Sequence, residues 1–99
     1  MAGNVFNPAA NHFRIDTVYD ANDLTKGGFF DGPIYVKMVT MKGATAGDSV
    51  VIQNRNSTAP VFERAASGAQ DEWMVEEWWH DGFKVTTKAG SGVLTIEAD

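Results

Sequence analysis

The sequence contains no cysteine and only two histidines, His12 and His80. Disulfides and thiolate metal sites are therefore excluded, and two histidines far apart in the chain are too few for a zinc or iron site. The eight lysine and arginine residues are scattered and the formal net charge is −5, which argues against a nucleic-acid-binding surface. No apolar run approaches transmembrane length, and residues 1–13 lack the pattern of a signal peptide. We therefore expect no cofactor, no metal, no nucleic acid and no membrane partner, and a chain made and used in the cytoplasm or in a particle assembled there.

The candidates for catalytic or metal-binding residues are few and poorly arranged. His80 and Asp81 are neighbours in an expected turn, where adjacent side chains point apart, so we expect a solvated histidine and not an acid–base pair. Glu76 and Glu77 follow one another on an expected strand and face opposite sides, so they cannot act as the paired carboxylates of a glycosidase. The acidic loop 20–33 has the length of an EF-hand loop, but an apolar residue takes a ligand position and no helices flank it. The sequence therefore predicts no active site and no calcium site.

Short segments with strand character recur along the chain, with turn residues between them. No segment longer than about ten residues shows a helical period. The pattern predicts an all-β fold, a small antiparallel β-sandwich or jelly-roll-like domain of about seven strands over residues 12–99, preceded by an extended N-terminal arm, residues 1–11. How the edge strands are protected is not evident, which leaves room for oligomerisation by sheet extension. The expected strands are 12–19, 33–42, 50–52, 61–65 and 93–97, with two more inside 71–88.

The segment 34–41 alternates as a strand, but both of its alternating sets contain apolar side chains. A strand that is apolar on both faces is typically central in its sheet, or is covered on its second face by another part of the protein. We therefore expect this segment to be a central strand or one with a cover on each face.

The three tryptophans lie close to the strongest hairpin signal, the sequence His-Asp-Gly at residues 80–82. Because neighbouring strand residues face opposite sides, Trp78 and Trp79 cannot both enter one core. A three-residue loop would put Trp79 inside and Trp78 beside Lys84, whereas a two-residue loop, residues 81–82, would reverse the two tryptophans. We favour the three-residue loop, with a left-handed glycine at its end, because it gathers five apolar side chains on one face with a single misfit, Glu77. These five are Trp73, Val75, Trp79, Phe83 and Val85.

Several apolar side chains exceed what one small stack of sheets can readily bury. Phe29 and Phe30 lie in a long polar loop, where they either cover one end of the sandwich or contact a partner. Trp78 faces away from the main core in the favoured loop and either packs under a loop or second sheet, or contacts another chain or a ligand. The N-terminal arm is either disordered or folds onto a neighbouring subunit through Val5 and Phe6. The candidate partner or subunit interface is therefore Val5, Phe6, Phe29, Phe30 and Trp78.

Two segments carry a serial pattern of turns and strands. Residues 34–54, IYVKMVTMKGATAGDSVVIQN, include a Gly-Asp pair before a valine-rich strand, and residues 80–98, HDGFKVTTKAGSGVLTIEA, end in a GSGVLTI strand. From residue 34 onward, over about two thirds of the chain, this pattern resembles a group of small virion proteins of tailed bacteriophages. The resemblance implies a structural role as a head decoration, fibre or tail component that binds other virion subunits.

Two classes of function follow. The first is a non-enzymatic virion structural protein, a capsid decoration or cement protein assembled in the host cytoplasm. Such a protein would act on the capsid surface as a homo-oligomer, a dimer or trimer, and bind the major capsid protein or other virion subunits through apolar patches. The alternative is a carbohydrate- or receptor-binding module of a phage fibre or tail, in which Glu76, Asp81 and Lys84 would read hydroxyl groups beside a stacking tryptophan. An enzyme or a metal-dependent domain is the least favoured class.

Overall fold

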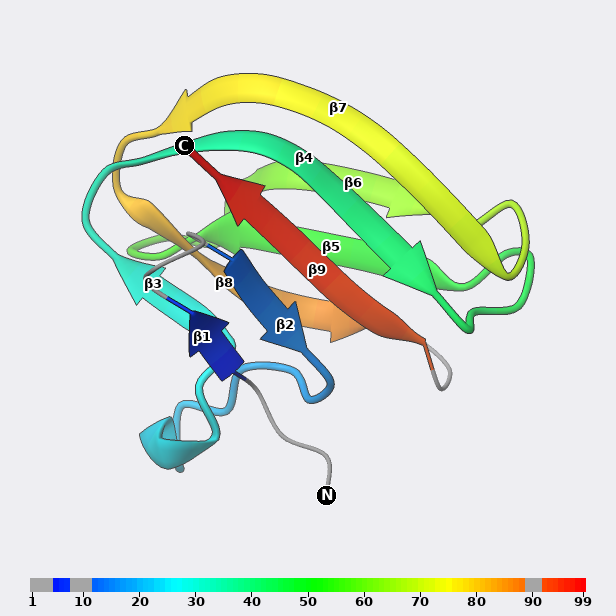
Figure 1. Ribbon diagram of the computed structural model, residues 1–99. Coiled ribbons are helices and arrows are strands. Elements are labelled where there is room, and N and C mark those ends of the chain that lie inside the picture. Colours follow the sequence, from blue (N-terminus) through cyan, green and yellow to red (C-terminus); the bar gives the residue numbers. More distant parts are fainter. Residues whose placement is uncertain (1–4, 8–11, 89–91) are drawn as a thin grey trace.

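Nine strands and one short 3-10 helix make up the described part of the chain (Figure 1). The computed structural model describes residues 5–7, 12–88 and 92–99, and for residues 5–7 it describes the backbone alone. Among these residues, no helix has the length and apolar character that crossing a membrane requires. The elements are β1 Val5–Asn7, β2 His12–Ile15, η1 Leu24–Lys26, β3 Phe29–Asp31, β4 Ile34–Lys42, β5 Ser49–Asn54, β6 Pro60–Ala65, β7 Gln70–Trp79, β8 Gly82–Lys88 and β9 Val93–Ala98.

The strands form two antiparallel sheets that face each other as a β-sandwich. The five-stranded sheet has the order β1-β2-β9-β4-β7, and the four-stranded sheet has the order β3-β8-β5-β6. In Figure 1, β2, β9 and β4 lie in front of β5, β6 and β8. The predicted all-β sandwich is therefore confirmed. Two strands were not expected, because β3 lies in the segment predicted to be a long loop and β1 in the segment predicted to be an arm.

Strand β1 is the outermost strand of the five-stranded sheet and pairs with β2. Phe6 lies opposite Phe13 in this pairing, so the prediction of an arm without secondary structure is wrong for this strand. Residues 1–4 and 8–11 of the predicted arm lie outside the described residues. The adjoining strand β2 ends at Ile15, earlier than predicted, and it turns Phe13 and Ile15 into the core.

The turn after the tryptophans joins the two sheets and does not close a hairpin. Strand β7 pairs with β4, whereas β8 pairs with β3 and β5, so the predicted hairpin is wrong for either loop length. Gly82 has the expected left-handed φ, 83°. The rings of Trp79 and Phe83 meet inside the sandwich with their centroids 5.7 Å apart. Because each ring comes from a different sheet, this connection fills the core from both sides, which a hairpin within one sheet cannot do.

The prediction of which tryptophan is buried is confirmed. Trp79 is 3% exposed, and Trp78 is 55% exposed. Trp78 lies opposite Tyr35 on β4. The favoured hairpin placed Trp78 beside Lys84, which is wrong, because Lys84 belongs to the other sheet. Glu77, the misfit of the pattern, stays exposed at the edge of the sheet and accepts a hydrogen bond from Trp79 Nε1 at 3.1 Å.

Strand β4 shows why its sequence is apolar in both alternating sets. Its register shifts between Val36 and Met38 against both neighbours, β7 and β9. A bulge of this kind changes which of the following side chains point inward. The strand therefore turns apolar members of both alternating sets into the same core. It lies between β9 and β7, a central place that was one of the two predicted arrangements. Its buried side chains before and after the bulge are Ile34, Val36, Val39 and Met41.

The core lies between the two sheets and contains only apolar side chains among the described residues. Every strand from β2 to β9 except β3 supplies at least one buried aliphatic or aromatic side chain, and β7 supplies Trp79 at its end. A core of this kind needs no further cover, which leaves the outer faces of the sheets for other roles. The buried residues are Phe13, Ile15, Ile34, Val36, Val39, Met41, Ala44, Val50, Ile52, Phe62, Ala66, Trp79, Phe83, Val85, Leu94, Ile96 and Ala98.

Candidate interaction surfaces

Trp78 is an exposed aromatic ring that two neighbours hold in place. It lies on the outer face of the five-stranded sheet, and its ring stacks on the imidazole of His80 with the centroids 6.2 Å apart and the planes inclined by 14°. The ring also meets Tyr35 edge to face at 5.6 Å. An indole fixed by its neighbours loses little conformational entropy when a partner covers it, and tryptophan is enriched at binding hot spots. Trp78 is therefore preorganised for contact with a partner.

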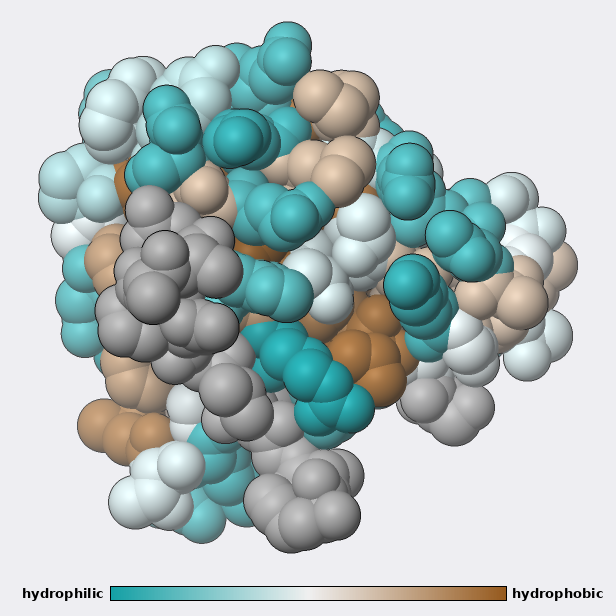
Figure 2. Space-filling view, viewed as in Figure 1, coloured by the Kyte–Doolittle hydropathy of each residue, from teal (hydrophilic) through white to brown (hydrophobic). Residues whose placement is uncertain are grey.

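Two methionines extend this exposed surface along the same strands. Met74 on β7 is 65% exposed and lies opposite Met38 on β4. With Lys37 and Glu97 they line a shallow hollow of about 330 Å³. Figure 2 shows that polar side chains cover much of this face and that apolar ones gather between them in small groups. Flexible methionine side chains adapt well to a partner. We refer to the side chains of Tyr35, Met38, Met74 and Trp78 as the outer patch.

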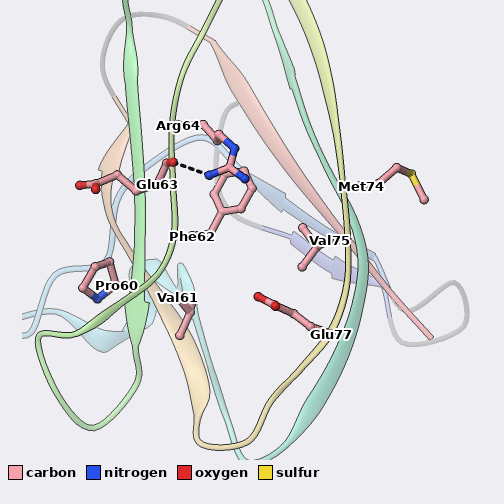
Figure 3. A pocket seen from close by; sticks show the side chains of 8 residues that line it. All are labelled: Pro60, Val61, Phe62, Glu63, Arg64, Met74, Val75 and Glu77. Carbon is pink, nitrogen blue, oxygen red and sulfur yellow. Dashed lines mark hydrogen bonds between the residues drawn. The ribbon is translucent and has the colours of Figure 1, made fainter.

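A groove runs between β6 and β7, which are the edge strands of the two sheets (Figure 3). Its volume is about 330 Å³. Val61 and Phe62 point into it from β6, and Val75 and Glu77 point into it from β7. Met74 points to the opposite side of β7. Among the described residues no further strand pairs with either edge, so alternate backbone N–H and C=O groups of both strands face the opening. We call this feature the edge groove.

Strand β7 is strongly acidic. Asp71, Glu72, Glu76 and Glu77 are its only charged residues. No ion pair among the described residues involves Glu72, Glu76 or Glu77. Glu76 has a left-handed φ of 51° beside the register shift of β4 and β7. Negative charge and irregular backbone are two ways in which proteins protect a free sheet edge from unwanted pairing. The edge of β7 therefore repels other acidic strands.

Asp71, at the start of β7, keeps its negative charge to a lower pH than an ordinary aspartate. The hydroxyl and the backbone N–H of Ser67 donate hydrogen bonds to its carboxylate, and these bonds lower the pKa of Asp71 from its ordinary value of 3.8. Because the pKa is lowered in the folded state, the resulting stabilisation is present above the unfolded-state pKa. It is lost as the pH falls through the folded-state pKa.

The substitution Ser67→Ala is expected to raise the pKa of Asp71 toward its ordinary value, because it removes the hydroxyl that donates to the carboxylate. A carbon-13 NMR titration of the aspartate carboxyl groups measures this shift. Ser57→Ala, in the turn between β5 and β6, is the matched control and should leave the titration of Asp71 unchanged. If the midpoint of Asp71 does not move in the Ser67 variant, the hydroxyl is not the cause of the low pKa.

The two phenylalanines predicted to contact a partner lie on β3, and both are partly buried. Phe30 packs against the core and meets Phe13 edge to face at 5.4 Å. Phe29 packs against the guanidinium of Arg55, whose central carbon lies 4.4 Å from the centroid of its ring. The same guanidinium lies 5.0 Å from the ring of Tyr19. The domain thus uses both phenylalanine rings internally, and the surplus of apolar side chains is smaller than the sequence indicated.

Of the predicted interface residues with described side chains, Trp78 is the one that is mainly exposed, and the side chains of Val5 and Phe6 lie outside the described residues. Neither Met74 nor the edge groove was among the predicted features. The signal for Met74 was available, because even-numbered residues of β7 share the side of the strand that carries Trp78. The groove had no such signal, because it depends on which strands are the edges of their sheets.

His80 and Asp81, which were considered as catalytic candidates, interact with different neighbours. His80 stacks on Trp78, and Asp81 accepts a hydrogen bond from Asn54 Nδ2 at 3.0 Å. Across residues 12–88 and 92–99, no group of three or more histidine, aspartate or glutamate side chains is placed to hold a metal ion. The features whose geometry supports a function are therefore the outer patch and the edge groove.

Comparison with known proteins gives little about the family. No family model matches the chain, and no solved structure matches it. The chain is similar to a thiosulfate sulfurtransferase of Corynebacterium glutamicum, with 34% identity over 77 residues. This match covers 65% of the chain but 26% of the relative, so the chain spans about a quarter of the length of the curated protein that it matches.

Proposed function

We propose that this domain is a non-enzymatic structural protein of a tailed-phage virion, a decoration or cement protein that binds assembled capsid subunits. The resemblance over residues 34–54 and 80–98 supports the assignment to a virion. The outer patch supports a contact with protein. In this proposal the domain sits on the capsid surface, and its partner is the major capsid protein or another virion subunit.

The observation that carries the proposal is an exposed, fixed tryptophan on a domain whose core is already complete. Trp79 fills the core, and Trp78 next to it turns to the outside, the side of β7 that Met74 also faces. Covering these side chains with a partner removes apolar surface from water, which favours association. Many copies on one particle would add avidity to a contact that is weak by itself.

An enzymatic role for these 99 residues has little chemical support. Transfer of sulfur through a covalent protein intermediate needs a thiolate nucleophile, and the chain has no cysteine. The partial likeness to a sulfurtransferase is therefore no basis for proposing that activity here.

A carbohydrate- or receptor-binding module is the second candidate, because Trp78 and Tyr35 together offer a stacking surface. Two of the polar groups expected beside the ring lie elsewhere or are engaged: Lys84 belongs to the four-stranded sheet, and Asp81 is bonded to Asn54. Of the three expected polar groups, Glu76 alone shares the side of β7 that carries Trp78. One carboxylate offers few hydrogen bonds to sugar hydroxyls, which favours a protein partner. Titration of a glycan panel, followed by tryptophan fluorescence, separates a sugar-binding from a protein-binding role. A fluorescence response that Trp78→Ala abolishes would support the sugar-binding role.

Co-sedimentation of the purified chain with heads of the phage that encodes it tests the proposal. We expect the chain to pellet with heads to saturation, and Trp78→Ala to weaken binding by about tenfold or more, because it deletes the exposed ring and leaves the core intact. Leu24→Ala is the matched control, since Leu24 is 52% exposed but belongs to η1, which lies at the bottom of Figure 1 while β7 lies at the top. No pelleting of the unmodified chain, or equal losses in both variants, would contradict the proposal.

A further inference from the structure

We infer that the free edge of β7 takes up an extended strand from a protein partner, and that this strand alternates apolar with basic side chains. The inference rests on the proposed function in one respect, which is that the partner is a protein. It adds the conformation and the chemistry of the segment that binds.

The edge of β7 has the length and the openness that strand addition needs. The strand has ten residues, of which 70–75 precede the left-handed Glu76 and offer a regular edge. It pairs with β4 on one side and is the last strand in the order of its sheet. A partner strand on the free side would hydrogen-bond to the backbone groups that face away from β4, as in other cases of β-augmentation. The edge groove beside it leaves about 330 Å³ for side chains of the added strand (Figure 3).

The two faces of an added strand would meet different surroundings. Its inward side chains would enter the edge groove, where Val61, Phe62 and Val75 are apolar. Glu77 also points into the groove, and its carboxylate accepts a hydrogen bond from Trp79 Nε1. Its outward side chains would lie beside Glu72 and Glu76, which have no ion-pair partner among the described residues. Because successive residues of a strand alternate between faces, the complementary segment alternates apolar and basic residues. The exposed ring of Trp78 would add a favourable contact for a lysine or arginine.

Charge disfavours a second copy of this chain as the occupant. Two β7 strands side by side would bring together four carboxylates from each copy, with no basic residue on either strand. The lysine-bearing strands β4 and β8 are paired on both sides inside their sheets. The other edge strands, β1, β3 and β6, carry no net positive charge. The described residues therefore contain no free strand of the required chemistry, and the occupant is a different protein.

A blocked octapeptide of alternating lysine and valine tests the inference when it is titrated into the nitrogen-15-labelled chain. We expect NMR shift changes concentrated in the amides of β7 and the indole of Trp78, and amide exchange in β7 slowed by about tenfold at saturation. The double variant Glu72→Gln with Glu76→Gln should weaken binding by about fivefold to tenfold, because it removes the two unpaired charges. Binding of the lysine–valine peptide to the chain should also weaken as salt is added.

Two further peptides separate strand addition from simple charge attraction. An octapeptide with the same side chains but N-methyl groups on alternate amides keeps the charge and cannot pair as a strand. It is expected to bind at least about tenfold more weakly. A glutamate–valine octapeptide is expected not to bind. The inference is overturned if the N-methylated peptide binds equally well, if the shifts map outside β7, or if no lysine–valine binding occurs at millimolar peptide.

The remaining outcomes distinguish this inference from the proposed function. Dimerisation of the chain alone through β7 would assign the edge to a second copy and overturn the inference. Binding to heads that depends on Trp78, without any effect of the lysine–valine peptide on β7, would leave the proposed function standing and remove the inference. Peptide binding at β7 without any binding of the chain to heads would support the inference and remove the proposed function.

Discussion

Replacing Gly82 with alanine is expected to remove most of the stability of the domain. Gly82 begins β8 with a φ of 83°, and a Cβ added to it would lie 2.0 Å from the backbone oxygen of Phe30. Strand β3 would have to move away from β8, which would disturb the pairing of Phe30 with Phe83 next to the core. We expect a loss of about 4 kcal/mol or more, which is exceptional for one substitution. Small domains have roughly 5–15 kcal/mol in total, so this loss would take a large share of the stability and lower the urea midpoint strongly.

Gly32→Ala is the matched control for this result. Gly32 also has a positive φ, 94°, but a Cβ added there meets no heavy atom within 4 Å. Its substitution should cost only the left-handed conformation, about 1–2 kcal/mol. Urea unfolding of the two variants measures the difference, and a Gly82 variant that fails to fold while the Gly32 variant folds meets the same expectation. Equal losses would show that β3 does not approach β8 as closely as described.

The two adjacent tryptophans are expected to respond very differently to alanine. Trp79→Ala removes a buried ring that contacts Phe83 and leaves a cavity between the sheets, so we expect a loss of about 3–5 kcal/mol in the free energy of unfolding. Trp78→Ala removes an exposed ring and its edge contact with Tyr35, for which we expect about 1 kcal/mol. Urea unfolding followed by far-UV circular dichroism compares the two, because tryptophan fluorescence itself changes in these variants.

Trp79→Phe provides a control for the size of the cavity, because it keeps an aromatic ring at the same place. It should cost clearly less than Trp79→Ala. A larger loss for Trp78→Ala than for Trp79→Ala would mean that the two rings have exchanged sides of β7. In that case the outer patch would have to be placed on the other face of the strand.

Local alternation in the sequence was enough to predict the all-β class and the inward direction of Trp79, Phe83 and Val85. It could not predict the partner of each strand, because alternation tells which face a side chain takes and not which strand lies beside it. The turn at residues 80–82 shows this limit, since its sequence is typical of a hairpin although it crosses between sheets. The bulge in β4 was also hidden, because its cause lies in the register with β7 and β9.

The candidate surface could likewise be predicted only in part, namely where it depends on the face that a side chain takes. Trp78 follows from the position of Trp79, because the next residue of a strand faces the other side. Phe29 and Phe30 looked exposed because their segment reads as a polar loop, but the pairing of β3 with β8 draws them into the domain. The edge groove required the order of strands in both sheets, which comes from pairing between distant parts of the chain.

The most direct test of β7 and the outer patch as the binding surface is hydrogen–deuterium exchange of the chain, alone and bound to heads. We predict slower exchange on binding in the segments 34–38 and 70–79, with no change in η1 or β3. Slower exchange confined to η1 or β3, with β7 unchanged, would contradict the assignment of this surface.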